Sequence, residues 1–167
     1  MPKKLLIVRH AHAEDRAISG RDFDRLLTEK GEAQAVEMVK ILSQTDFRPA
    51  LFYSSPAPRA KRTAELFAEG LAYPTDRIQF VEGIYEASLY NLVSIVNRFD
   101  NQADAIVMFG HNPAFTYLAD YLGNQPIDGL AKAGMVLIHF ENEDWASISQ
   151  GDGATQWVRS PKENFMF

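Results

Sequence analysis

Two of the four histidines in this sequence directly follow short apolar segments. His10 comes two residues after the run 5–8, and His111 comes two residues after the run 105–109. Runs of this length and character suit strands that are buried on both faces of a parallel sheet. Ligands of open α/β sheets bind outside the carboxyl ends of the strands, so both imidazoles are expected at the same edge.

Two arginines accompany these histidines. Arg9 precedes His10, and Arg59 lies one turn into a helix that follows the short strand 51–53 and Ser54-Ser55. A guanidinium group grips two oxygens at once and stays charged at any relevant pH. A neutral imidazole is an adequate nucleophile toward phosphorus, and a second histidine can carry charge near neutrality and donate a hydrogen bond. These residues together favour chemistry on a phosphoryl group.

Each of these residues, taken singly, also has a plain structural explanation as a turn, a strand end or a charged helix surface. Their joint placement after three strands is what favours the functional interpretation. The other two histidines fit structural roles better: His12 is expected near the rim of the site, and His139 on the outer face of a strand.

Composition limits the class of protein. The chain has 167 residues, of which 46% are hydrophobic and 23% charged, and we expect one domain over residues 1–167. The absence of cysteine excludes disulfides, a thiolate nucleophile and Cys-based metal sites. The net charge of -5 gives no general attraction to nucleic acid or to an anionic membrane. Without a signal peptide or a run of roughly 18 apolar residues, a cytoplasmic protein is expected.

Short apolar runs alternate with helical periodicity, which predicts an α/β fold with a largely parallel sheet. Helices are expected over 28–45, 58–69 and 89–99 and from Pro113 through Tyr121. Strands are expected at 5–8, 51–53, 78–81 and 105–109, with an antiparallel edge formed by runs near 134–141, 145–149 and 156–159.

Three segments resemble, in order, the motifs of the histidine phosphatase superfamily, which includes cofactor-dependent phosphoglycerate mutases and acid phosphatases. Residues 6–11 are similar to its Arg-His-Gly signature, and residues 54–63 to its Ser-Ser-Pro-x-x-Arg-Ala-x-x-Thr motif. Residues 110–113 match its Gly-His-Asn-Pro motif, and the resemblance spans residues 5 to about 122. Three motifs in this order are far more specific than any one of them.

The resemblance implies a phosphoglycerate mutase-like fold: a three-layer α/β/α sandwich with a mostly parallel central sheet and an antiparallel edge. It implies that His10 is the nucleophile and is transiently phosphorylated, with Arg9, Arg59 and His111 around the phosphate. A phosphoenzyme route needs neither a metal ion nor another cofactor, and none is expected.

Within the superfamily the chain looks most like the SixA-type branch of small protein-phosphohistidine phosphatases, because it lacks the large insertions of mutases and acid phosphatases. Residues 24–28 are similar to that branch's Asp-Arg-Pro-Leu-Thr segment. Ala11 replaces the usual glycine, which requires a negative φ, and Leu26 replaces a proline. Neither departure removes a catalytic group.

The general acid is the least defined part of the site. Many members of the superfamily use a carboxylate to protonate a leaving alkoxide, and Glu86 is the best-placed candidate because it follows the third strand. A glutamate at the start of a helix is explained equally well by the helix dipole. A phosphohistidine would need no strong acid, since its leaving nitrogen departs more easily.

Three functions follow from these residues. The first is hydrolysis of protein phosphohistidine, the second is hydrolysis of small phosphomonoesters with Glu86 as acid, and the third is phosphate binding without catalysis. The expected partner is a phosphorylated substrate, with neither nucleic acid nor membrane involved. The sequence favours a monomer and leaves the oligomeric state and the physiological substrate open.

Overall fold

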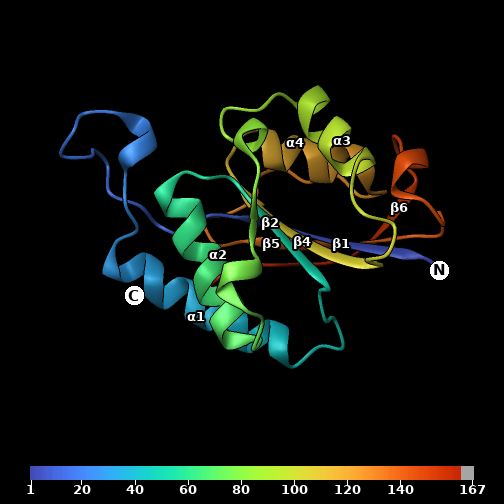
Figure 1. The fold of residues 1–167 in the computed structure, drawn as a ribbon, viewed down its shortest axis with the longest axis horizontal. Coiled ribbons are helices and arrows are strands. Elements are labelled where there is room, and N and C mark those ends of the chain that lie inside the picture. Colours follow the sequence, from blue (N-terminus) through green and yellow to red (C-terminus); the bar gives the residue numbers. More distant parts are fainter. Residues whose placement is uncertain (163–167) are drawn as a thin grey trace.

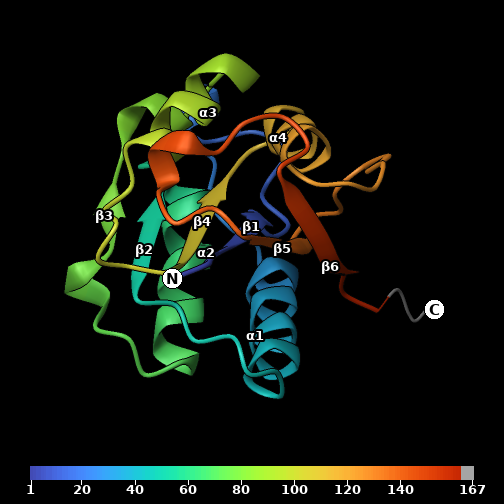
Figure 2. The ribbon, with the colours of Figure 1, turned by 90° about the vertical axis from the view of Figure 1, so that its right-hand side faces the viewer.

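The strands form one mixed, six-stranded sheet (Figure 1), and Figure 2 shows them side by side in the order β3-β2-β4-β1-β5-β6. The strands are β1 (Lys3–Arg9), β2 (Leu51–Ser54), β3 (Gln79–Phe80), β4 (Ala105–Gly110), β5 (Met135–Phe140) and β6 (Gly153–Arg159). The first four in the sheet order are parallel, whereas β5 and β6 run antiparallel to their neighbours. The structure, a computed structural model, describes residues 1–162. The predicted parallel sheet with an antiparallel edge is confirmed.

Helices cover both faces of this sheet (Figure 2). They are α1 (Glu29–Ser43), α2 (Pro58–Gly70), α3 (Leu89–Asn97) and α4 (Ala114–Leu122). The pair α1 and α2 packs on one face and the pair α3 and α4 on the other, which confirms the three-layer sandwich. Among residues 1–162, no helix has the length and apolar character needed to cross a membrane.

The central strand β1 is buried on both faces. Leu6 and Val8 belong to the core beneath α1 and α2, whereas Leu5 and Ile7 belong to the core beneath α3 and α4. This is the environment that a continuous apolar run predicts. It places β1 in the middle of the sheet beside β4, so the residues that follow these two strands emerge next to each other.

One predicted strand is wrong. Residues 145–147 form a short 3-10 helix, η4 (Trp145–Ser147), instead of part of an edge strand over 145–149. The indole of Trp145 is fully buried, and its Nε1 donates to the carbonyl of Ala103 at 2.8 Å. Two core side chains, Trp145 and Ile148, produce the apolar signal here. The other elements agree with the predictions to within a few residues, and β3 is reduced to two residues.

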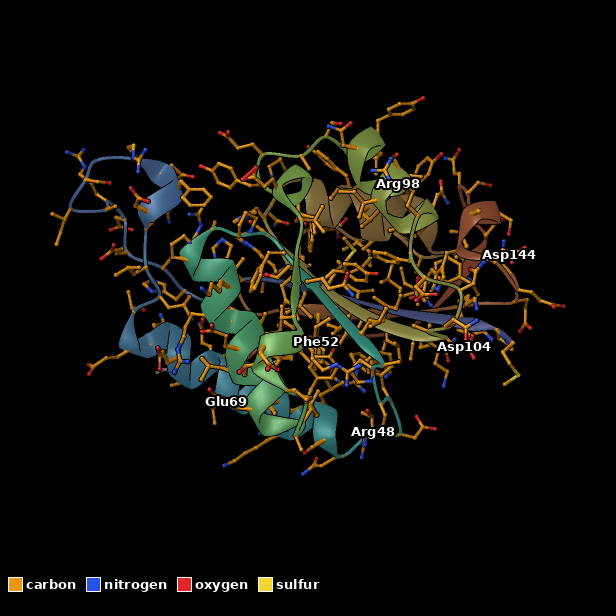
Figure 3. The ribbon with its side chains drawn as sticks, in the orientation of Figure 1. Arg48, Phe52, Glu69, Arg98, Asp104 and Asp144 are labelled. Carbon is orange, nitrogen blue, oxygen red and sulfur yellow. The ribbon has the colours of Figure 1, made fainter. Side chains whose placement is uncertain are left out.

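An ion pair joins the amino ends of β1 and β4, at the opposite end of these strands from the histidines. The ammonium group of Lys3 is 2.7 Å from a carboxylate oxygen of Asp104, and Lys3 is only 1% exposed. Asp104, labelled in Figure 3, directly precedes β4 at the end where β1 begins. The pair therefore aligns the amino ends of the two strands whose carboxyl ends carry the candidate site.

Candidate active site

The carboxyl ends of β1 and β4 bring the two predicted histidines together. Arg9 is opposite Gly110 in the parallel register, and the backbone N–H of His10 donates to the carbonyl of Gly110 at 3.0 Å. The ring centroids of His10 and His111 are 5.3 Å apart. The expectation that both imidazoles meet at one edge of the sheet is confirmed.

The second motif packs against the same place. Arg59 lies in the first turn of α2 and is only 4% exposed. One turn later, the hydroxyl of Thr63 donates to the Arg59 carbonyl at 2.8 Å and accepts from the backbone N–H of Ala11 at 3.1 Å. Ala11 is fully buried and is not among the described residues with positive φ, so alanine is accommodated in place of glycine. Thr63 thus ties the start of α2 to the residue after His10.

His10 has the protonation state of a nucleophile. Its Nδ1 lies 2.7 Å from the carbonyl oxygen of Ala11, which can only accept, so Nδ1 carries the hydrogen and Nε2 keeps its lone pair. Burial lowers the pKa of His10 to about 4, and the positive charges of Arg59 and Arg9 act in the same direction. At neutral pH the ring is therefore uncharged.

His111 is a neutral hydrogen-bond donor. Its Nε2 lies 2.8 Å from the Ser55 hydroxyl, whose oxygen already accepts from the backbone N–H of Ala57. We assign the Ser55 hydroxyl as the donor to Nε2, which places the hydrogen of the neutral ring on Nδ1; the Ser55 oxygen has two acceptor sites, so its contact with Ala57 leaves this a tautomer assignment. Burial, His10 and Arg59 lower the pKa of His111 to about 3. The expectation that this histidine carries charge near neutrality is therefore wrong for the protein without a bound anion. The ring is buried, and the positive charge of Arg59 lies nearby.

The two arginines are held at their outer nitrogens. Arg9 Nη1 donates to the carbonyl of Leu130 at 3.0 Å, and the Asn112 amide donates to the same oxygen at 3.0 Å. Arg59 Nη1 and Nη2 donate to the backbone carbonyl and the carboxylate of Asp22 at 2.8 and 2.9 Å. Both guanidiniums are thus fixed by acceptors from loops outside the sheet.

Three buried nitrogen atoms have no hydrogen-bond partner among residues 1–162: Arg9 Nε, Arg59 Nε and His111 Nδ1. Leaving a buried donor unsatisfied costs about 1–3 kcal/mol, so three of them in the groups around His10 need an explanation. A tetrahedral anion with several acceptor oxygens would satisfy them. Its phosphorus atom would face the unprotonated Nε2 of His10.

Two side chains of the site were not predicted from the sequence. The Tyr85 hydroxyl donates to Asp22 Oδ2 at 2.9 Å, and the Tyr85 ring meets His111 edge-on at 5.4 Å between centroids. The Arg59 guanidinium lies over the same ring at 5.9 Å. Asp22 lies in a polar loop without periodicity; for Tyr85, its position beside Glu86 was the one available signal.

Glu86 lies apart from these contacts. It is exposed, adopts a φ of 54°, and forms no hydrogen bond or ion pair within residues 1–162. The helix-dipole explanation for Glu86 is wrong, because α3 begins at Leu89 with Ser88 as its N-cap. Within residues 1–162 no hydrogen bond or ion pair links Glu86 to the other four predicted site residues, so its role as general acid stays a prediction.

The remaining histidines have structural partners. His12 Nδ1 is 2.7 Å from the hydroxyl of Thr28, the N-cap of α1, and His139 on β5 is 3.0 Å from Glu141. No three His, Asp or Glu side chains gather into a possible metal site in the described part of the chain, residues 1–162.

Comparisons with known proteins agree with this geometry. The sequence profile of the histidine phosphatase superfamily (branch 1) matches residues 5–92, a segment that holds His10 and Arg59. An uncharacterised chloroplastic protein of Arabidopsis thaliana is 26% identical over 163 residues, which are 93% of this chain and 74% of that protein.

Solved structures share the fold. A protein of Nakamurella multipartitia assigned to phosphohistidine phosphatase SixA superposes with a TM-score of 0.84 and 20% identity, covering 96% of this chain and 97% of that one. The protein histidine phosphatase SixA in complex with tungstate has a TM-score of 0.81 and 20% identity, covering 95% and 97% of the two chains. With the profile match over more than half of its length, this chain belongs to the histidine phosphatase superfamily, branch 1, and is a phosphatase with a SixA-like fold.

Proposed function

We propose that this phosphatase hydrolyses phosphohistidine on a partner protein, through a phosphohistidine formed on its own His10. The observation that carries the proposal is the group of three buried, unpartnered nitrogens around an uncharged histidine whose Nε2 is free. A binding module would need the arginines but not a nucleophile. The direct test is hydrolysis of a histidine-phosphorylated protein, with mass spectrometry of the acid-labile phosphoryl group on His10.

In the first step, His10 Nε2 attacks the phosphorus atom in line with the leaving group. A P–N bond to His10 forms while the P–N bond of the substrate breaks. The leaving nitrogen keeps the bonding electron pair, and the substrate imidazole departs neutral because its other ring nitrogen carries a proton taken from solvent. The Nε–H groups of Arg9 and Arg59 and the Nδ1–H of His111 stabilise charge on the phosphoryl oxygens. Water then attacks the phosphorus, releases inorganic phosphate and restores His10.

The charges near the pocket support a substrate that leaves without strong acid assistance. The carboxylate in contact with the site is Asp22, and hydrogen bonds from Arg25, Tyr85 and Arg59 hold its pKa well below its usual range. It is therefore ionised and has no proton to give. An alkoxide would need an acid at this point, whereas the imidazole of phosphohistidine needs less help.

The role of Glu86 separates this proposal from hydrolysis of small phosphomonoesters. We expect Glu86→Gln to change kcat/KM by less than about threefold on a phosphohistidine protein, because the leaving imidazole needs no carboxylic acid. The same variant should be assayed on an alkyl phosphate such as glycerol phosphate. A loss of about a hundredfold on the ester with little loss on the phosphohistidine protein favours the phosphohistidine phosphatase, since general acid catalysis then matters for the ester alone. A comparable loss on both substrates would contradict the proposal.

The titration of His10 is expected to lie well below that of an ordinary histidine. The pKa near 4 keeps the ring neutral down to about pH 5, so the imidazole NMR signal that disappears in His10→Ala should hold its neutral-form shift there. In the unfolded chain, His10 binds its proton near pH 6.5, whereas in the folded protein it does so only near pH 4. Between these pH values the unfolded state binds more protons, so the free energy of unfolding should fall as the pH drops from about 6.5 toward 4. A midpoint near that of N-acetyl-histidine amide in the same buffer would contradict the buried, neutral nucleophile.

A further inference from the structure

The guanidinium of Arg59 is held at its two outer nitrogens by a single residue, Asp22. Asp22 accepts from Nη1 through its backbone carbonyl and from Nη2 through its carboxylate, at 2.8 and 2.9 Å. A guanidinium carries five N–H groups in a fixed plane, so holding both outer nitrogens fixes the direction of the remaining N–H groups. Nε, which is buried and unpartnered among residues 1–162, is one of those that remain.

Asp22 is itself held by two further side chains. Arg25 Nη1 donates to Oδ1 at 2.8 Å, and the Tyr85 hydroxyl donates to Oδ2 at 2.9 Å. The Asp22 residue lies in the 3-10 helix η1 (Asp22–Asp24), within the segment between β1 and α1 that extends past the carboxyl ends of the strands (Figure 1). Phe23 packs edge-on against Tyr85 with 5.0 Å between centroids. Asp22 therefore joins three segments that are distant in the sequence.

On the basis of the proposed function, we infer that Asp22 is a positioning residue for phosphoryl transfer: it holds Arg59 so that the Nε side of the guanidinium faces the transferring group. Asp22 occupies the outer nitrogens and leaves the buried one free, so it does not compete with the phosphoryl oxygens for Nε. The carboxylate also supports the orientation of Tyr85, whose ring forms the wall beside His111.

The chain offers a matched control in the same 3-10 helix. Asp24 accepts from the Ser19 hydroxyl at 2.8 Å and from Arg21 Nε at 3.0 Å, and neither partner contacts the site. Asp24→Asn removes a carboxylate charge two residues from Asp22 without touching Arg59. It therefore measures how much a general disturbance of the loop contributes.

The experiment compares Asp22→Asn and Asp24→Asn by kcat and KM on an aryl phosphate, and by calorimetric titration with tungstate. We expect Asp22→Asn to lower kcat/KM and tungstate affinity by about tenfold, because Arg59 is then no longer held in place and its Nε–H no longer points at the anion. Asp24→Asn should stay within about twofold of wild type. Thermal unfolding of each variant verifies that the fold is retained.

A double-mutant cycle separates positioning from a merely structural role. In an Arg59→Ala background, Asp22→Asn should change tungstate affinity by less than about twofold, since its effect passes through Arg59. Equal losses in the presence and absence of Arg59, or equal losses in Asp22→Asn and Asp24→Asn, would overturn the inference. Tighter tungstate binding in Asp22→Ala would also overturn it, because Asp22 would then be a competitor for Arg59.

Tyr85→Phe provides a second, milder variant in which one hydrogen bond to Asp22 is lost while the Arg59 contacts stay. It should give a smaller loss of tungstate affinity in the same direction, and no loss would count against the inference. Tungstate binding is measured without turnover. An inactive wild type would therefore refute the proposed function, and the anion affinities would still decide the role of Asp22.

Discussion

Turnover of phosphohistidine and of aryl phosphates is expected to vanish in His10→Ala, with a fall of about a thousandfold or more. The variant removes the Nε2 lone pair that forms the covalent intermediate. The neighbouring His111 is also neutral, but in the tautomer assigned above its Nε2 lone pair accepts from the Ser55 hydroxyl and does not replace that of His10. The measurement is single-turnover release of inorganic phosphate. Phosphoryl transfer to the protein should disappear at the same time.

The control for this experiment is His139→Ala, which removes an imidazole on β5 that pairs with Glu141. It should keep wild-type rates. Tungstate should still bind to His10→Ala, because the arginines remain. If wild type and His10→Ala are equally inactive yet bind tungstate equally well, the chain is a phosphate-binding module and the proposed mechanism is wrong.

The second large effect is expected for Arg9→Ala, with a fall in kcat of about a hundredfold or more, the scale seen when one preorganised donor is removed from developing charge. Arg9 presents one of the three buried, unpartnered nitrogens, and it also lowers the pKa of His10. Loss of Arg9 should therefore weaken charge stabilisation and make protonation of the nucleophile easier. Steady-state kinetics as a function of pH measures both consequences.

Arg98→Ala is the matched control for charge. Arg98 follows α3, is labelled in Figure 3, and donates to the hydroxyl of Ser94 at 3.1 Å. Its removal should leave kcat within about twofold of wild type, since in the described part of the chain Arg98 forms no hydrogen bond or ion pair with a site residue. An Arg9→Ala variant that retains wild-type kcat would show that Arg9 does not face the phosphoryl group.

That the four main site residues lie together was predictable, because their proximity follows from a small number of physical rules. These residues are Arg9, His10, Arg59 and His111. Apolar runs such as 5–8 and 105–109 can be satisfied only in the middle of a sheet, and parallel strands end at a common edge. Once β1 and β4 are neighbours, the residues after them must meet. Arg59 follows because a helix directly after β2 starts at that same edge.

What could not be predicted depends on the path of loops and on burial. Asp22 lies in a polar stretch whose course has no periodic signal, so its contact with Arg59 follows from the folded loop alone. The neutral state of His111 is set by burial and by its cationic neighbours, which are not visible along the chain. The prediction of an edge strand over 145–149 was wrong because the two buried residues Trp145 and Ile148 belong to a 3-10 turn and its end, and a short apolar pattern does not distinguish such a turn from a strand.

The site depends on a backbone atom, the carbonyl oxygen of Leu130, and a comparison of side chains alone would miss this dependence. Arg9 is oriented by this carbonyl, which Asn112 also contacts, while the Leu130 N–H donates to Thr116 at 3.0 Å. Any residue at position 130 supplies a backbone carbonyl, so a substitution there does not remove the acceptor. A one-residue insertion or deletion between α4 and β5, in contrast, would turn the carbonyl away. The orientation of Arg9 therefore depends on the length and course of this segment, and only indirectly on which side chains it carries.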